Sequence, residues 1–209
     1  MAFNIIVDIH GVITNDNLFT NLDYLRTKTD KKTIFTKVLG SMPENIIAKK
    51  ILLQGISFYT RGAKIRNQAS TTIDQFRIEG DRVILMTRVP FANDETTIEG
   101  QKIRAKNELN LLENNINYDD IIYVNGNKIA ACKATKADVI IDDNPNNIYA
   151  LSNAGFKVIC FRTDYNQIVE NDETKEIYIA HNWDEVYSLV QELKRQKKKK
   201  GNNILKYTL

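Results

Sequence analysis

Five short runs of apolar residues, separated by stretches with helical periodicity, most strongly constrain the fold of this chain. The runs are rich in isoleucine and valine, and their continuous apolar character is typical of strands buried on both faces of a parallel sheet. Strands that alternate with helices in this way predict an α/β fold with a Rossmann-like parallel sheet flanked by helices. The predicted strands span residues 3–9, 82–87, 120–124, 138–142 and 156–161.

Two of the intervening helices are predicted from the spacing of their apolar residues. A helix over residues 98–116 and another over residues 62–78 each repeat apolar residues at helical spacing. One face of each helix is therefore expected to pack on the protein core. These faces consist of Ile98, Ala105, Leu109, Leu112 and Ile116 in the first helix, and of Ile65, Ala69, Ile73 and Phe76 in the second.

The interval between the first two strands is long and contains helical patterns but no comparable strand pattern. We predict that residues 16–60 form a small helical insertion after the first strand, and that residues 1–15 and 61–190 form the α/β core. Aromatic residues in this insertion could stack on a nucleobase, or they could form the insertion's own core. They are Phe19, Tyr24, Phe35, Phe58 and Tyr59.

The net charge of +3 comes from the end of the chain. Residues 191–209 contain seven lysines and arginines and one glutamate, so residues 1–190 carry a net charge of −3. We treat residues 191–209 as a basic C-terminal tail. A lysine-rich run of this kind is typical of a solvated helix end, and contact of Lys197–Lys200 with nucleic acid is the alternative.

Apolar runs and cysteine usage indicate a cytoplasmic protein. No apolar run approaches the ~20 residues that span a bilayer, and we see no basic and apolar segment of the kind that directs secretion. The two cysteines, Cys132 and Cys160, are too few for a structural zinc site. We expect both to be buried thiols, and we expect no association with membranes.

Polar residues follow four of the predicted strands, at the point where each strand ends. Asp8 follows the first strand, Thr87 ends the second, Lys128 lies shortly after the third, and Asp142 and Asp143 close the fourth. The carboxyl ends of parallel strands meet at one edge of the sheet, where open α/β sheets bind their ligands. Each residue alone is typical of a turn or a helix cap. Their appearance in order after successive strands predicts one functional site.

Three carboxylates at one edge repel one another unless a cation neutralises them. Mg²⁺ suits a small set of hard oxygen ligands and also takes phosphate oxygens. Thr87 and Lys128 would then hold a phosphate near the metal ion. Asp8 is placed to attack phosphorus as a carboxylate nucleophile.

These residues resemble the motifs of the haloacid dehalogenase superfamily. "VDIHGVIT" is similar to its first motif, "RVILMT" to the second and "DVIIDD" to the acidic fourth, while Lys128 fits the third. The helical insertion matches the position of a type-1 cap in that superfamily. The resemblance covers about residues 3–166, and it implies a phosphatase with a capped, Rossmann-like core.

The resemblance also implies a role for each motif residue. Asp8 would be the nucleophile and a Mg²⁺ ligand, and the backbone carbonyl of His10 and the carboxylate of Asp143 would be further ligands. Asp142 would shape the surroundings of the metal ion. Thr87 and Lys128 would bind the transferred phosphoryl group.

A narrower resemblance is to the 5'(3')-deoxyribonucleotidase branch of the superfamily. Residues 137–167, "ADVIIDDNPNNIYALSNAGFKVICFRTDYNQ", are similar to that branch's acidic segment and its later apolar strand. The branch usually reads Thr-x-Arg where this chain has Thr87-Arg88-Val89-Pro90. The resemblance implies a small phosphate ester as substrate, a (deoxy)nucleoside monophosphate, with Arg88 beside Thr87 in substrate binding.

The chain departs from the superfamily pattern at His10. The residue usual at this position is a second aspartate, which protonates the leaving oxygen and later activates water. A histidine can do both, because its pKa lies near neutrality and a neighbouring carboxylate favours its charged form. Three hypotheses stay open: an active Mg²⁺-dependent phosphatase, a non-catalytic or impaired module that binds phosphate or protein, and a polynucleotide-end phosphatase that uses Lys197–Lys200.

Overall fold

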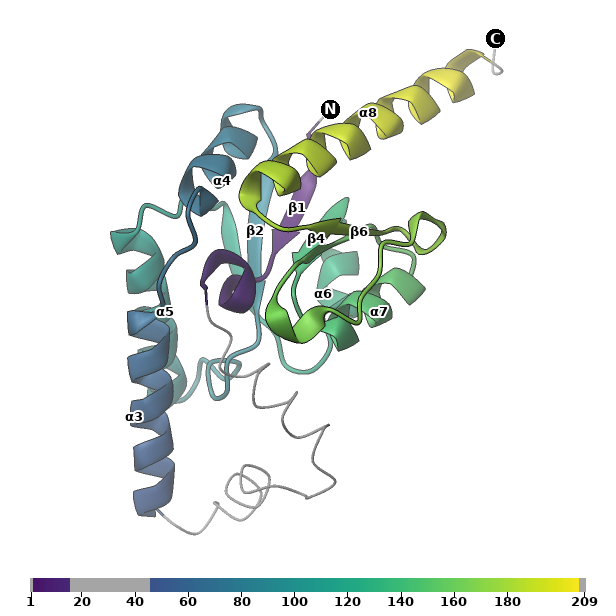
Figure 1. Cartoon of the computed structure of the whole chain (residues 1–209). Coiled ribbons are helices and arrows are strands. Elements are labelled where there is room, and N and C mark those ends of the chain that lie inside the picture. Colours follow the sequence, from purple (N-terminus) through teal and green to yellow (C-terminus); the bar gives the residue numbers. More distant parts are fainter. Residues whose placement is uncertain (1, 16–45, 207–209) are drawn as a thin grey trace.

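A single parallel sheet forms the centre of the molecule (Figure 1). The computed structural model describes residues 2–15 and 46–206 of the chain. Its six strands lie in the order β3-β2-β1-β4-β5-β6, and every neighbouring pair is parallel. The strands are β1 (Asn4–Val7), β2 (Arg82–Thr87), β3 (Asp120–Tyr123), β4 (Val139–Asp142), β5 (Val158–Phe161) and β6 (Ile177–Ala180).

The predicted Rossmann-like sheet is confirmed, and all five predicted strands are present. The first strand ends two residues earlier than predicted, at Val7, because the chain turns directly after Asp8. The sixth strand, β6, was not predicted. Its apolar run is only four residues long and follows the charged segment 172–176, so its pairing with β5 at the sheet edge is what identifies it as a strand.

The position of β1 determines where a site can form. β1 lies between β2 and β4, with Val7 in register with both Leu85 and Ile141. Strand β2, the next strand along the chain, therefore pairs on one side of β1, and β4 pairs on the other side. This reversal of strand order is the switch point where open α/β sheets bind ligands. The residues that follow β1, β2 and β4 consequently share one edge.

Helices cover both faces of the sheet (Figure 1). Apolar side chains of α4 and α8 pack on one face, and those of α6 and α7 pack on the other. Cys132 of α6 and Cys160 of β5 are both buried free thiols, as predicted. The helices are α3 (Ile46–Gly62), α4 (Ala69–Ile78), α5 (Ile98–Glu113), α6 (Ile129–Ala134), α7 (Pro145–Asn153) and α8 (Trp183–Lys206), with short turns η1 (Ile9–Ile13), η3 (Asp164–Asn166) and η4 (Glu173–Lys175).

Most of the buried face predicted for the helix over 98–116 is wrong, because α5 ends at Glu113 and, of the five predicted residues, Ile116 alone is buried, beyond the end of the helix. In α5, Ile98 and Leu112 are 66% and 71% exposed, whereas Ile103 and the polar Asn110 point inward. The amide of Asn110 donates hydrogen bonds to the carbonyls of Thr60 (3.1 Å) and Ala63 (3.0 Å), which the end of α3 leaves without helical partners. This polar contact with α3 orients α5, and apolar periodicity could not reveal it.

The helix predicted over 62–78 is shorter than expected. α4 begins at Ala69, and Ala69, Ile73 and Phe76 are buried as predicted. Ile65 lies outside the helix because it forms an isolated antiparallel bridge with Thr14. The segment before α4 is therefore used to join two distant parts of the chain.

Helix α3 lies in the second part of the segment predicted to form the cap, and it packs along α5 (Figure 1). It continues to Gly62, two residues past the boundary predicted at residue 60. The first part of the cap, with Phe19, Tyr24 and Phe35, lies outside the described residues.

The basic segment 191–209 begins inside α8, which runs unbroken to Lys206. Leu193 is buried in the core, and Lys194 forms ion pairs with Glu79 and Asp81. The start of this segment therefore belongs structurally to the α/β core. In the part of the chain that is described, no helix is long and apolar enough to cross a membrane.

Candidate active site

The chain makes a tight turn where β1 ends. The backbone N–H of Asp8 still donates to the carbonyl of Ile141 (2.9 Å), which fixes Asp8 beside β4. The turn η1 follows, and the N–H of Thr14 closes it by donating to the carbonyl of Ile9 (3.0 Å). Gly11 has a φ of +91° inside this turn, a conformation that favours glycine.

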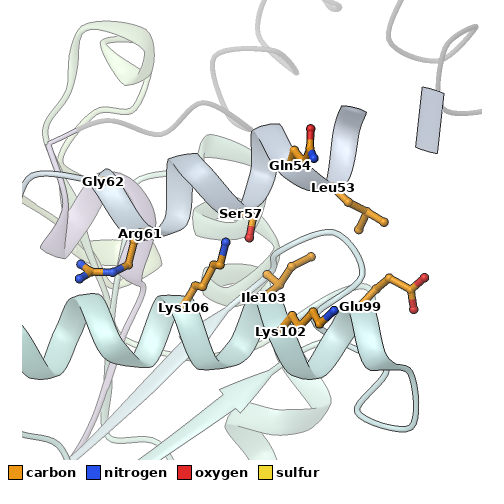
Figure 2. Close-up of a pocket in the computed structure, with 9 residues that line it drawn as sticks. All are labelled: Leu53, Gln54, Ser57, Arg61, Gly62, Glu99, Lys102, Ile103 and Lys106. Carbon is orange, nitrogen blue, oxygen red and sulfur yellow. The ribbon is translucent and has the colours of Figure 1, made fainter. Parts of the chain in front are cut away.

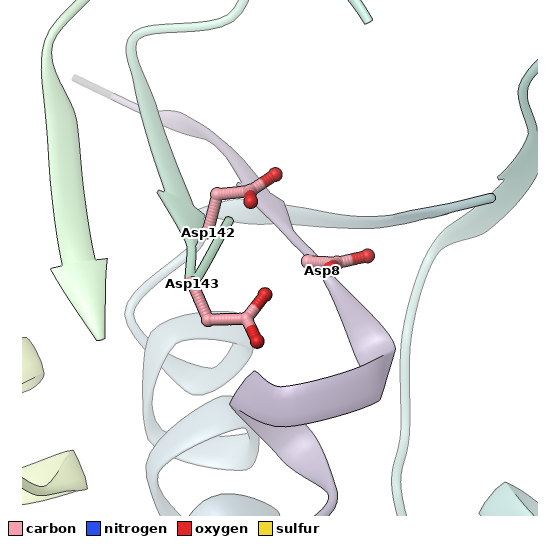
Figure 3. Close-up of side chains that lie close together, drawn as sticks. All are labelled: Asp8, Asp142 and Asp143. Carbon is pink, nitrogen blue, oxygen red and sulfur yellow. The ribbon is translucent and has the colours of Figure 1, made fainter. Parts of the chain in front are cut away.

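Three aspartates meet at the carboxyl edge of the sheet (Figure 3). Asp8, Asp142 and Asp143 each offer a carboxylate oxygen, and these oxygens lie within 4.8 Å of one another. All three side chains are buried. The predicted convergence of the first and fourth strand ends is therefore observed.

The ammonium group of Lys128 lies between two of these carboxylates. Its Nζ is 2.9 Å from Oδ1 of Asp8 and 2.7 Å from Oδ2 of Asp142, and the side chain is only 3% exposed. Burial disfavours the charged lysine, but the two carboxylates outweigh burial and raise its pKa above the ordinary value. Lys128 is consequently a permanent cation within the cluster.

Asp8 and Asp142 share the ammonium of Lys128, and Asp143 is a third buried carboxylate beside them. Burial raises the pKa of Asp8 to about 6, the Lys128 charge opposes that rise, and the Asp142 charge adds to it. Carboxylates gathered in a buried site favour a cation, because burial disfavours their charged form. Buried carboxylate oxygens at this spacing fit a divalent ion such as Mg²⁺.

The two aspartates of the fourth motif are held differently. The carboxylate of Asp142 accepts hydrogen bonds from the backbone N–H of Asn144 (2.9 Å) and the side-chain amide of Asn147 (3.2 Å to each oxygen), besides its ion pair with Lys128. Hydrogen-bond donors therefore occupy both carboxylate oxygens of Asp142, which suits a residue that holds Lys128 in place rather than one that binds a cation directly. Asp143 is held through its backbone, because the amide of Asn166 donates to its carbonyl (2.8 Å).

Asn166 was not identified from the sequence. It is fully buried, and its amide also donates to the carbonyl of Phe161 (2.8 Å), so it joins the ends of β4 and β5. The sequence did not mark this role, because the carbonyl of Asp143, 23 residues away along the chain, is brought to Asn166 by the tertiary fold. Asn147, which donates to Asp142, lies in the first turn of α7.

Gly11 allows the turn to approach Asp143. A Cβ atom at residue 11 would lie 1.8 Å from Oδ2 of Asp143 and 2.6 Å from the hydroxyl of Tyr165. Neither contact is sterically possible, so a residue without a side chain is required here. The glycine of the first motif is thus explained by both its φ and its surroundings.

His10 is the second residue of the turn η1 and is 3% exposed. Its ring is 5.4 Å from that of Tyr59 on α3, with an angle of 40° between the planes. Burial, assisted by the Lys128 charge, lowers the pKa of His10 to about 4. This is opposite to the direction expected from a neighbouring carboxylate, because burial and the lysine dominate.

The two remaining predicted residues lie on β2 and directly after it. Thr87 ends β2 and is buried at the same sheet edge as Asp8. Arg88 follows it and is exposed. The structure thus gathers Asp8, Lys128, Asp142 and Asp143 into one cluster, places Thr87 at the same edge and leaves Arg88 at the surface.

A separate groove of about 630 Å³ runs between α3 and α5 (Figure 2). Leu53 and Ile103 supply apolar surface, and Arg61, Lys102 and Lys106 are among the charged residues that line it. None of the four cluster residues lines this groove.

A six-stranded parallel sheet with this acidic cluster beside a buried lysine defines a phosphatase of the haloacid dehalogenase type. The family described as "5' nucleotidase, deoxy (Pyrimidine), cytosolic type C protein" matches residues 68–197. A nucleotidase from Clostridium acetobutylicum is 36% identical over 200 residues, which cover 91% of this chain and 94% of the relative. The chain belongs to this nucleotidase family.

Solved structures agree on the fold. A D,D-heptose 1,7-bisphosphate phosphatase from B. bronchiseptica, complexed with magnesium and phosphate, superposes with a TM-score of 0.55 at 13% identity over 91% of this chain and 99% of that chain. A haloacid dehalogenase-like hydrolase from Burkholderia xenovorans gives a TM-score of 0.57 at 10% identity, with 92% and 98% covered.

Proposed function

We propose that this protein is a Mg²⁺-dependent phosphomonoesterase that acts on (deoxy)nucleoside monophosphates with Asp8 as its nucleophile. The observation that carries this proposal is the buried cluster of Asp8, Asp142 and Asp143 beside Lys128. The nucleotide substrate is supported by the family and by the relative's name.

The cluster suggests how the reaction divides into two displacements. A carboxylate oxygen of Asp8 attacks phosphorus, the bond from phosphorus to the ester oxygen breaks, and that oxygen leaves as the alcohol with a proton taken from solvent. Water then attacks the phosphorus of the aspartyl-phosphate, which releases phosphate and restores the carboxylate of Asp8.

The surrounding residues hold the phosphoryl group and the metal ion. Asp8, Asp143 and the backbone carbonyl of His10 would bind Mg²⁺, which supplies neutralising charge for the phosphate oxygens. Lys128 and the hydroxyl of Thr87 would bind those oxygens, and Asp142 would keep Lys128 in place. These groups are already fixed in position, which is the basis of electrostatic stabilisation in a transition state.

His10 would act chiefly on the water step. Its lowered pKa leaves the imidazole neutral near pH 7, so it can accept a proton from the attacking water. The ring of Tyr59 on α3 lies beside His10, so we place the leaving group on the α3 side of the site.

The His10→Asp variant is expected to keep or raise the phosphatase rate, because it restores the carboxyl group usual in the superfamily. His10→Ala is expected to lower kcat by about 10²-fold, the low end of the range for general acid–base catalysis. The measurement is kcat for both variants over a pH series. Equal kcat values for His10→Ala and wild type would remove His10 from the proton transfers.

The function is tested by phosphate release from a panel of nucleotides and sugar phosphates, with Mg²⁺ and with chelator. We expect Mg²⁺-dependent release, fastest from deoxynucleoside monophosphates. Mg²⁺-induced thermal stabilisation without turnover of any substrate would instead indicate a binding module.

The polynucleotide hypothesis is tested in the same panel with a phosphate-ended oligonucleotide. Truncation after Gln191 would remove the buried Leu193, so the better variant replaces only the exposed Lys198 and Lys199 with glutamine. If that variant loses oligonucleotide turnover at low salt and keeps mononucleotide turnover, α8 binds nucleic acid.

A further inference from the structure

The two chain segments that flank the proposed cap are joined to each other. Thr14 and Ile65 form an antiparallel bridge. The N–H of Asn15 donates to the carbonyl of Lys64 (2.8 Å), and the N–H of Arg66 donates to the carbonyl of Ile13 (2.8 Å). The exit from the turn η1 and the return before α4 therefore run side by side.

The side chain of Arg66 binds back onto the turn. Its Nη2 donates to the carbonyls of Gly11 (3.0 Å) and Asn15 (3.2 Å), and its Nε donates to the carbonyl of Thr14 (3.1 Å). Its guanidinium carbon also lies 4.7 Å from the centre of the Phe161 ring. A planar guanidinium can bridge several carbonyls and stack on a ring at once, which the ammonium of lysine cannot do.

These contacts fix the peptide between His10 and Gly11. The N–H of Gly11 donates to Oγ1 of Thr14 (3.3 Å). In a planar trans peptide the carbonyl points opposite to the N–H, so this bond sets the direction of the His10 carbonyl. Arg66 in turn holds the carbonyls of both Gly11 and Thr14.

The same contacts control the distance to Asp143. Gly11 is packed so closely on Asp143 that no Cβ fits between them. A shift of the turn would therefore change the separation of the His10 carbonyl from the carboxylate of Asp143.

We propose that Arg66 is a positioning residue for the cation site: through Gly11 and Thr14 it holds the His10 carbonyl at the place where the cation needs it. This inference rests on the cation of the proposed function. It adds a residue that touches neither substrate nor metal ion and that lies on the segment returning from the cap.

The test compares Arg66→Lys with wild type and with Arg77→Lys, which alters a surface arginine paired with Asp119 (3.1 Å). We expect Arg66→Lys to need about 10- to 100-fold more Mg²⁺ for half-maximal phosphate release, as found when residues that orient metal ligands are changed. It should also lose most of the Mg²⁺-induced rise in Tm. Arg77→Lys should match wild type in both measurements.

A second pair of variants guards against simple unfolding. Thr14→Val removes the hydroxyl that holds the Gly11 N–H, whereas Thr14→Ser keeps it. If Arg66 acts through Thr14, the valine variant repeats the loss of Mg²⁺ affinity and the serine variant recovers it. Equal Mg²⁺ dependence of wild type, Arg66→Lys and Thr14→Val would overturn the proposal.

The two readouts separate this inference from the proposed function. If wild type releases no phosphate but Mg²⁺ raises its Tm more than that of Arg66→Lys, the phosphatase function fails and the positioning role stands. If Mg²⁺ leaves the wild-type Tm unchanged, no cation is held and the role of Arg66 falls with it.

Discussion

The Asp8→Asn variant is expected to lose phosphatase activity by at least about 10³-fold, because an amide cannot replace a carboxylate as the attacking group. The substitution keeps the shape of the side chain, and Lys128 keeps its ion pair with Asp142 (2.7 Å). Phosphate release under single-turnover conditions measures the effect. Activity equal to wild type would show that Asp8 is not the nucleophile.

Two controls keep this result interpretable. Asp120→Asn removes an exposed carboxylate from β3 and should leave the rate unchanged. Asp8→Asn should also be at least as stable as wild type without Mg²⁺ at neutral pH. Burial raises the pKa of Asp8 from 3.8 to about 6, so the folded state loses stability as pH rises through that interval and Asp8 ionises. A large fall in Tm would contradict this.

The Gly11→Ala variant is expected to have the second largest effect. Its Cβ would meet Oδ2 of Asp143 at 1.8 Å, so the turn and Asp143 must separate. Activity should fall by at least about 10²-fold, since a displacement of this size misplaces catalytic groups. The Mg²⁺-induced rise in Tm should fall with it, and a Mg²⁺ titration followed by thermal unfolding measures that loss.

Gly155→Ala is the matched control for backbone strain. Gly155 has a φ of +87°, close to the +91° of Gly11, but a Cβ there would meet nothing within 4 Å. Its variant should lose roughly 1 kcal/mol or somewhat more of stability from strain alone and keep full activity. If both variants retain wild-type Mg²⁺ dependence, the close packing of Gly11 on Asp143 has no role in the site.

The sequence was most informative where function depends on strand ends. Asp8, Lys128, Asp142 and Asp143 were predicted to meet, and their side chains do converge. This was possible because a parallel sheet brings the carboxyl ends of its strands to one edge, so order along the chain predicts proximity.

Features that depend on tertiary contacts could not be predicted in this way. Arg66 lies more than fifty residues from the carbonyls it binds, and no periodicity marks it. The buried face predicted for α5 was mostly wrong because the amide of Asn110 points inward and donates to the carbonyls of Thr60 and Ala63, at the end of α3 and just after it. The lowered pKa of His10 depends on burial, which local sequence did not indicate.

The most direct test of the central proposal follows the phosphoryl group itself. Wild-type protein is mixed with a deoxynucleoside monophosphate carrying radiolabelled phosphate, quenched in acid at successive times within one turnover, digested, and its labelled peptide sequenced. We expect label on residue 8, removable by hydroxylamine and absent with chelator. Label on His10, or complete turnover with no labelled peptide at any time, would contradict the role of Asp8.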